Sequence, residues 1–152
     1  MKKATILIVD DNESILETLS SILEEKGYKI DTAKSGAEAI EKSRTKFYNM
    51  ALLDVKLPDM EGTRLLTKMK ETRPKMVKIM ITGYASLQNA IEALNFGADA
   101  YIMKPLDPDN LLNVIAEKLT VQRETEKMSE ERVVEWIETR VRKLERERLV
   151  KA

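Results

Sequence analysis

The sequence predicts an α/β fold built on a doubly wound parallel sheet, and three features of its 152 residues support this. Short apolar runs alternate with segments whose apolar residues recur at helical spacing, the patterns of buried strands and of amphipathic helices. The runs are uninterrupted, as in residues 5–9, TILIV, which is typical of strands covered on both faces. Strict alternation of strand and helix then favours right-handed crossovers, with helices on both faces of one sheet.

The first strand, residues 5–9, is followed by a helix over residues 13–26 that stops at Gly27, a residue suited to a left-handed cap. The apolar face of this helix consists of Ile15, Leu19, Ile22 and Leu23. A short second strand covers residues 28–33. The stretch Ser35-Gly-Ala-Glu38 has the spacing of a capping box, so a second helix begins there.

The third and fourth strands are predicted at residues 50–53 and 77–81. The helix between them is marked by Leu65, Leu66 and Met69. It closes at Arg73-Pro74, because a residue that precedes proline disfavours helical backbone.

Ser86 caps a predicted fourth helix that stops at Gly97. The shared face of this helix consists of Leu87, Ala90, Ile91 and Leu94. Residues 100–103 form the fifth strand, and Pro108 suits the first turn of a fifth helix. The buried stripe of the fifth helix is predicted to be Leu112, Ile115 and Leu119. Together the elements predict a flavodoxin-like sheet of order 2-1-3-4-5 with five helices.

Composition limits the chemistry available to the chain. It has 26 basic and 26 acidic residues, so its net charge of zero predicts no general affinity for nucleic acid or for an anionic membrane. It has no Cys and no His, which excludes disulfides, thiolate chemistry, an imidazole base and the usual zinc ligands. Neither a signal-peptide apolar region nor a run of membrane-spanning length is present, so we expect a cytoplasmic protein.

The length indicates one domain, residues 1–120, and a charged helical extension, residues 121–152. Residues 120–132 contain too few apolar side chains to bury a face, and we expect a linker or a solvated helix there. Apolar residues then return at a spacing of three, four and three, at Val134, Ile137, Val141 and Leu144. Two interpretations stay open: a helix lying back on its own domain, or a helix that binds a partner or a second copy as a homodimer.

Polar side chains follow four of the predicted strands. They are Asp10 and Asp11, Asp54, Thr82 with Gly83, and Lys104 with Pro105. Singly, each has a structural explanation, such as a helix cap or a turn. In an open α/β sheet, however, the carboxyl ends of the strands line the ligand crevice, so we expect these side chains to converge on one rim.

Three adjacent carboxylates would repel one another and raise their pKa values unless a cation lay among them. Without His or Cys, that cation should prefer oxygen ligands, and Mg²⁺ fits best. Beside a metal, one carboxylate can attack a phosphoryl group and form an aspartyl phosphate. Lys104 and the Thr82 hydroxyl are then suited to bind phosphoryl oxygens.

Residues 4–119, which include these strand-end side chains, resemble the response regulator receiver domain, the CheY-like module of two-component signalling. The motifs that carry the resemblance are Ile8-Val-Asp-Asp11, Leu52-Leu-Asp-Val-Lys-Leu-Pro-Asp-Met-Glu-Gly62, Met80-Ile-Thr-Gly83 and Tyr101-Ile-Met-Lys-Pro105. The stretch from Met80 to Ile91 looks like receivers of the NtrC kind, in which a helical linker leads to an ATPase and a DNA-binding domain.

The resemblance implies that Asp54 is the phosphoacceptor. It implies that Mg²⁺ is bound by Asp11, Asp54 and the backbone carbonyl of Lys56, with Asp10 joining through water. Lys104 would pair with the phosphoryl group, and a cis bond before Pro105 would aim it into the site.

The resemblance also implies a switch. Thr82 would swing toward the phosphoryl group, helped by backbone N–H groups near Val55 and Gly83, and Tyr101 would turn inward to fill the vacated space. A half-buried strand aromatic is the alternative explanation for Tyr101. Lys56 and Tyr84 occupy positions that tune the access of hydrolytic water in this family, and we hypothesise that bulky Tyr84 slows loss of the phosphoryl group.

These residues favour a phosphorylation-driven switch. A sensor histidine kinase would donate to Asp54, and the face formed by the fourth helix, fifth strand and fifth helix would then bind a downstream protein. The only chemistry expected is self-phosphorylation and self-dephosphorylation.

Two alternatives are weaker. A phosphohydrolase of the haloacid dehalogenase type needs Asp-x-Asp after the first strand and a cap over the substrate, and Asp10-Asp11-Asn12 supplies neither. An input domain cut from a larger DNA-binding regulator is the other, although the chain itself has no Walker motif.

Overall fold

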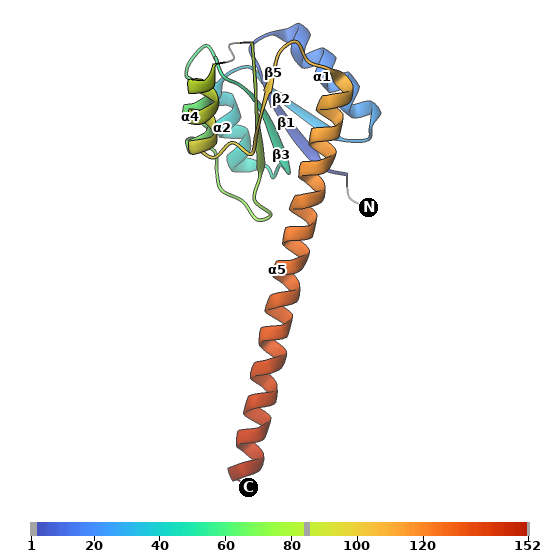
Figure 1. Ribbon diagram of the computed structural model, residues 1–152, viewed down its shortest axis with the longest axis vertical. Helices are drawn as coiled ribbons and strands as arrows, with labels where there is room; N and C mark the ends of the chain where they lie inside the picture. Colours follow the sequence, from blue (N-terminus) through green and yellow to red (C-terminus); the bar gives the residue numbers. More distant parts are fainter. Residues whose placement is uncertain (1–2, 84–85, 152) are drawn as a thin grey trace.

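The computed structural model describes residues 3–83 and 86–151. It confirms a five-stranded parallel sheet of order β2-β1-β3-β4-β5. The strands are β1 (Thr5–Val9), β2 (Lys29–Ala33), β3 (Met50–Asp54), β4 (Val77–Thr82) and β5 (Ala100–Met103). The helices are α1 (Glu13–Glu25), α2 (Gly36–Thr45), α3 (Gly62–Lys68), α4 (Leu87–Asn95) and α5 (Pro108–Lys151). Figure 1 shows the sheet between two helical layers, with α5 running past it.

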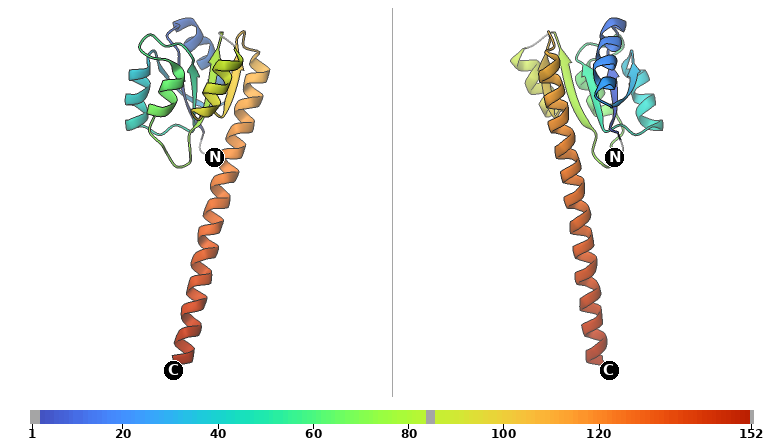
Figure 2. Two further views of the ribbon diagram at one scale, coloured as in Figure 1. Left: turned by 60° about the vertical axis from the view of Figure 1, so that its left-hand side comes forward. Right: turned by 90° about the vertical axis from the view of Figure 1, so that its right-hand side faces the viewer.

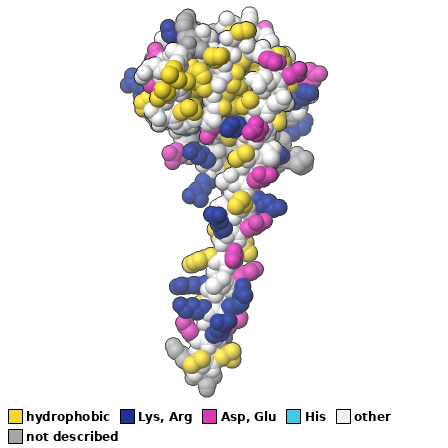
Figure 3. Space-filling model, in the orientation of Figure 1, with side chains coloured by type: hydrophobic (Ala, Val, Ile, Leu, Met, Phe, Trp, Pro, Cys, Tyr) yellow, Lys and Arg dark blue, Asp and Glu magenta, His cyan; other side chains and the backbone are white. Residues whose placement is uncertain are grey.

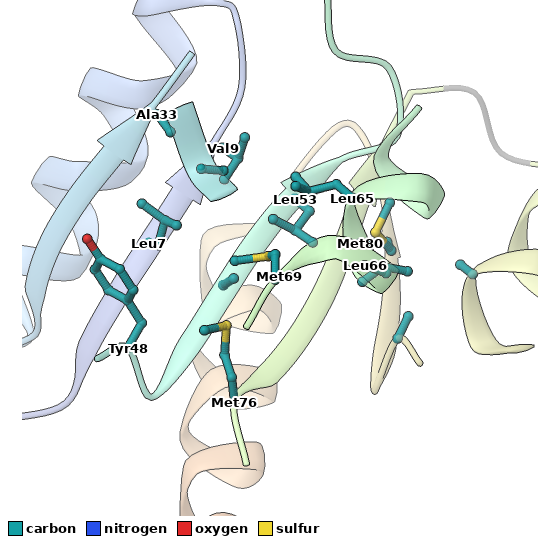
Figure 4. Packing of buried hydrophobic residues seen from close by; sticks show 14 of the residues in the cluster. Leu7, Val9, Ala33, Tyr48, Leu53, Leu65, Leu66, Met69, Met76 and Met80 are labelled. Carbon is teal, nitrogen blue, oxygen red and sulfur yellow. The ribbon is translucent and has the colours of Figure 1, made fainter. Parts of the chain in front are cut away.

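Two apolar clusters fill the space on either side of the sheet. One joins the sheet to α1 and α5, and the other joins it to α2, α3 and α4. Side chains of β1 alternate between them, since Ile6 and Ile8 belong to the first cluster and Leu7 and Val9 to the second. Figure 4 shows the second cluster, in which Tyr48 and Met76 lie near the start of β3 and Met80 lies beside Leu65 and Leu66. Burial on both faces explains the uninterrupted apolar runs.

The strand register aligns the carboxyl ends of the three central strands. Val9 lies opposite Leu53, and Asp54 lies opposite Ile81 in the pairing of β3 with β4. In the last pairing Thr82 lies opposite Met103. The residues that follow these strands therefore lie on one rim of the sheet.

The helix ends follow the predicted capping chemistry. Ser35 Oγ accepts a hydrogen bond from the Glu38 N–H at 3.1 Å, and Ser86 Oγ accepts one from the Asn89 N–H at 3.0 Å. Gly27 and Gly97 have φ of +92° and +102°, as left-handed residues after α1 and α4. Asn12, rather than either neighbouring Asp, caps α1 by accepting from the Ile15 N–H. The two aspartates of the motif are therefore not needed as caps.

Two helices differ from the prediction in detail. Helix α3 ends at Lys68, because Met69 has extended backbone with ψ of 143° and turns its side chain into the core. On α5, Leu111 is the deeply buried residue of the first turns and Leu112 is only partly buried. Ile115 and Leu119 are buried as predicted.

The extension forms no separate linker. Helix α5 continues without interruption over 44 residues, so residues 120–132 are the solvated helix of the two alternatives. Side chains from 127 to 150 are all exposed, so the helix does not lie back on its domain. Both views in Figure 2 show it projecting away from the sheet. Among the described residues, no helix is long and apolar enough to span a membrane.

Gln122 fixes the point at which α5 leaves the domain. Its side chain is 8% exposed, and its Nε2 donates to the carbonyl of Asn49 at 2.9 Å and to that of Lys75 at 2.7 Å. Its Oε1 accepts from Asn49 Nδ2 at 3.3 Å. One amide thus joins α5 to the residues that precede β3 and β4.

Candidate functional site

The rim brings the three predicted carboxylates together. Asp10 and Asp11 follow β1 and Asp54 ends β3, and one carboxylate oxygen of each lies within 4.8 Å of the other two. Asp10 is buried, Asp54 is partly buried and Asp11 is exposed. The cluster is therefore open to solvent on the side of Asp11.

Lys104 supplies a positive charge to the cluster. Its Nζ lies 3.4 Å from Asp10 Oδ2 and 3.9 Å from Asp54 Oδ2. Its backbone N–H donates to the Thr82 carbonyl at 2.8 Å, and the Lys104–Pro105 peptide bond is cis. The ammonium therefore reaches the carboxylates from the neighbouring side of the rim.

The environment of Asp54 disfavours its charged form. Burial raises the pKa of the Asp54 carboxyl, and the negative charge of Asp10 raises it further, while the Lys104 ammonium opposes the rise. A neighbouring cation would reverse this balance. The electrostatics thus favour a bound cation beside Asp54.

The donor set fits Mg²⁺. The groups that converge are carboxylate oxygens, which are the ligands that this ion prefers. The chain offers no imidazole or thiolate to favour a softer metal.

The loop after Asp54 turns back toward the site. The Lys56 N–H donates to Asp54 Oδ1 at 3.4 Å, and the Gly62 N–H donates to the Val55 carbonyl at 2.6 Å. A Cβ at Gly62 would lie 2.1 Å from the Asp54 carbonyl oxygen and 2.8 Å from a Met80 side-chain carbon. Only glycine permits this approach.

Two loop residues with a structural role were missed from the sequence. The Asp59 carboxylate accepts from the N–H groups of Gly36 at 2.8 Å and Ala37 at 2.9 Å, and so caps α2 from a distance along the chain. The Met60 side chain covers Gly36, where an added Cβ would meet its sulfur at 2.4 Å. The pair Pro58-Asp59 is typical of a turn, but no local pattern shows which helix Asp59 would cap.

The predicted switch residues lie next to each other. Thr82 is fully buried at the end of β4. Tyr101, on β5, is half-buried and packs against the same core cluster as Met80. Burial raises the pKa of the Tyr101 hydroxyl, and its interaction with the Thr82 side chain opposes that rise. Gly83 leaves space beside Lys104, since an added Cβ would lie 3.9 Å from Lys104 Cδ. Tyr84 lies outside the described residues.

Residues 6–116 match the response regulator receiver domain. The chain belongs to this family. Receiver domains are phosphoacceptor switches that bind Mg²⁺ at an aspartate cluster and are phosphorylated by histidine kinases. In this chain Asp10, Asp11 and Asp54 form such a cluster.

A longer transcriptional regulatory protein contains a region similar to this chain. The chain is 35% identical over 125 residues to the transcriptional regulatory protein ZraR of Klebsiella oxytoca, covering 82% of this chain and 28% of that protein. The receiver therefore spans little more than a quarter of the length of that relative.

Solved structures agree on the fold. A CheY-like receiver domain from Methanospirillum hungatei is 52% identical, with a TM-score of 0.78, over 82% of this chain and 99% of that chain. A response regulator from Burkholderia pseudomallei, described with a phosphorylated aspartic acid and a calcium ion, is 30% identical with a TM-score of 0.70. That match covers 82% of this chain and 73% of the Burkholderia chain.

Proposed function

We propose that this receiver accepts a phosphoryl group on Asp54 from the phosphohistidine of a sensor kinase. One observation carries the assignment of the residue: the Asp54 carboxylate lies at a buried strand end, 3.9 Å from Lys104 Nζ and beside two further carboxylates. A rigid strand end holds a nucleophile in a fixed position. The Burkholderia relative, whose aspartic acid is phosphorylated, supports the same chemistry.

In the transfer, an Asp54 carboxylate oxygen attacks phosphorus and the phosphorus–nitrogen bond to the donor imidazole breaks. The electron pair of that bond stays on the imidazole, and an acyl phosphate forms on Asp54. Later attack by water on phosphorus releases inorganic phosphate and restores the carboxylate. The same attack would permit self-phosphorylation from a small phosphodonor, and the reaction with water is self-dephosphorylation.

The side chains around Asp54 have distinct roles in this proposal. Asp11, Asp54 and the Lys56 carbonyl would hold Mg²⁺, with Asp10 joining through water, and the ion would supply positive charge against the incoming phosphoryl group. The Lys104 ammonium and the Thr82 hydroxyl bind phosphoryl oxygens. Backbone N–H groups near Val55 and Gly83 complete the binding site.

The signal would leave through α4, β5 and α5. When Thr82 turns toward the phosphoryl group, Tyr101 fills the vacated space and the surface above it changes. Exposed apolar residues occur on α4 and β5, namely Leu87, Ile91, Leu94 and Met103. Figure 3 shows this apolar cluster over α4. A downstream protein with an apolar contact surface is the expected partner, acting in the cytoplasm.

The length of the relatives supports a second role as the input domain of a larger regulator. ZraR is more than three times as long as the matched region, since that region covers 28% of it. In that case α5 would lead to an output domain. The balanced charge of the chain still favours protein rather than nucleic acid as the direct partner.

Intact mass spectrometry after incubation with Mg²⁺ and acetyl phosphate tests the assignment. We expect one added phosphoryl group that hydroxylamine removes, and none on Asp54→Asn. Asp109→Asn is the matched control, because Asp109 is exposed in the first turn of α5. An adduct that persists in Asp54→Asn, or no adduct on the folded wild type, would overturn the proposal.

A further inference from the structure

The part of α5 beyond the domain lacks the packing that normally stabilises a helix. After Gln122 it continues to Lys151, and its side chains from 127 to 150 are exposed. Helices in water gain most of their stability from packing an apolar face. This extension has such a face and exposes it, as the yellow side chains along the shaft in Figure 3 indicate.

The apolar face is a short heptad stripe. Its members are Val134, Ile137, Val141 and Leu144, which are 53%, 49%, 48% and 58% exposed. They occupy positions a, d, a and d of two heptads, and Val at both a positions favours a two-stranded assembly. Lys127 and Arg148 occupy the a positions before and after the stripe, so the apolar repeat is confined to residues 134–144.

We propose that this stripe pairs with the same stripe of a second copy, in a parallel, in-register two-stranded coiled coil. The stripe can pair with an identical stripe, because each apolar residue then packs against the same residue of the second copy. This contact lies beyond the receiver and does not depend on the function of Asp54.

Charges beside the stripe select the parallel orientation. In a parallel pair, Arg140 at position g faces Glu145 at position e of the second copy, and symmetry repeats the contact. In an antiparallel pair that matches the same apolar layers, position e faces e and position g faces g. The acidic e positions, Glu131, Glu138 and Glu145, would then repel one another, and the two Arg140 side chains would meet.

The heptad positions that precede the stripe do not support pairing on the side of the receivers. Lys127 and Glu130 take the core positions before the stripe, and Glu126 would face Glu131 of the second copy. Like charges there disfavour pairing. The two helices therefore separate before they reach their receivers, and the coiled coil is short enough for dimer formation to depend on protein concentration.

Sedimentation of the full chain over a range of concentrations tests the pairing. We expect the mass to rise from 17.4 kDa toward twice that value. Ile137→Asp should weaken association by more than about tenfold, because it places a carboxylate in an apolar layer. Thr139→Asp is the matched control, since position f faces away from the stripe, and it should associate like wild type.

A wild-type chain that stays monomeric at all concentrations would overturn the pairing, as would an Ile137→Asp variant that associates normally. Circular dichroism would verify that each variant retains its folded receiver. Trp136 provides a second readout, because it is the only tryptophan and Arg140 lies 5.8 Å from its ring centre. In the dimer, Arg140 would pair with Glu145 of the second copy and move away from the Trp136 ring. The fluorescence of Trp136 should therefore change with protein concentration.

Two experiments separate the orientations. The chain has no native Cys, so Val134→Cys and Leu144→Cys should each form a disulfide-linked dimer alone if the helices are parallel. Linkage only in a mixture of the two variants would show an antiparallel pair and overturn the proposed orientation. Glu145→Arg should weaken a parallel dimer, because the new arginine would face Arg140 of the second copy. Adding Arg140→Glu in the same chain should restore the opposite charges and therefore the dimer. Stronger association of the single Glu145→Arg variant would instead indicate the antiparallel pair.

Discussion

Gly62 controls how closely the loop after β3 approaches the phosphoacceptor. Its N–H bonds to the Val55 carbonyl, and the space that a side chain would need is occupied by the Asp54 backbone and Met80. The residue is required for a close contact rather than for an unusual φ angle. It is the first residue of α3 and contacts the backbone of the nucleophile, so a change there should affect both.

Gly62→Ala should lower the free energy of unfolding by about 1–3 kcal/mol, the usual cost of overpacking a filled site. The added Cβ would lie 2.1 Å from the Asp54 carbonyl oxygen, so the backbone must move. Gly83→Ala is the control, since the nearest atom to its Cβ would be 3.9 Å away. Urea denaturation of the two variants measures the difference, and equal midpoints would contradict the prediction.

Asp31 shows how a residue outside the site controls acid stability. Its Oδ2 accepts from Lys46 Nζ at 2.8 Å and from the buried Tyr48 hydroxyl at 2.6 Å. The hydrogen bond from Lys46, followed by that from Tyr48, lowers the pKa of the Asp31 carboxyl below its ordinary 3.8. The folded state therefore favours the charged carboxylate.

Because the pKa of Asp31 is lower in the folded than in the unfolded state, its stabilisation is fully present above about pH 4. This stabilisation is lost as the pH falls from about 4 through the lowered pKa of Asp31 in the folded state. Asp31→Asn should therefore reduce stability at neutral pH and flatten its decline below pH 4, as thermal unfolding across pH would show. The exposed-site variant Asp109→Asn should keep the wild-type decline.

Elements could be predicted where their signals are local. Ser35 and Ser86 cap the helices that they precede, and Gly27 and Gly97 end helices, because these interactions join residues a few positions apart. The polar strand-end residues were also predictable, since a parallel sheet brings all its carboxyl ends to one rim.

Other features of the elements depend on contacts between distant residues. The cap that Asp59 provides to α2 crosses 23 positions, and the contacts of Gln122 cross 73 and 47 positions. The end of α3 is decided by the burial of Met69 rather than by a helix-breaking residue. The continuity of α5 had a local signal, because no Gly or Pro follows Pro108.

Gln122→Ala should lower the free energy of unfolding by about 1–3 kcal/mol, because it removes the amide that donates two part-buried hydrogen bonds to backbone carbonyls, each contributing about 0.5–1.5 kcal/mol. Those carbonyls belong to Asn49 and Lys75. Glu124→Ala is the matched control, being exposed two positions further along α5. Denaturation of both variants tests the prediction, and an unchanged midpoint for Gln122→Ala would show that water replaces the amide.

The whole molecule consists of a receiver and a shaft that share one helix. The sequence placed the boundary between residues 120 and 121, which stays a prediction. The contacts of Gln122 indicate that the folded receiver extends at least that far. Truncations can locate the boundary directly.

A chain ending at residue 126 should keep the stability and the Asp54 phosphorylation of the full chain, because the side chains that it loses from 127 to 150 are exposed. A chain ending at residue 120 should be less stable, because it loses Gln122. Thermal unfolding and acetyl phosphate labelling compare the two. Equal stability of the two truncated chains would place the boundary where the sequence did.

Helix α5 begins four residues after Lys104 and ends far beyond the opposite edge of the sheet (Figure 1). It therefore acts as a lever with its fulcrum at Gln122. At 1.5 Å per residue, the arm from Gln122 to Lys151 is about 44 Å long. A tilt of about 5° at the fulcrum would move the far end by about 4 Å, more than the usual shift of a packed helix. A rearrangement too small to alter the core would thus become large at the tip.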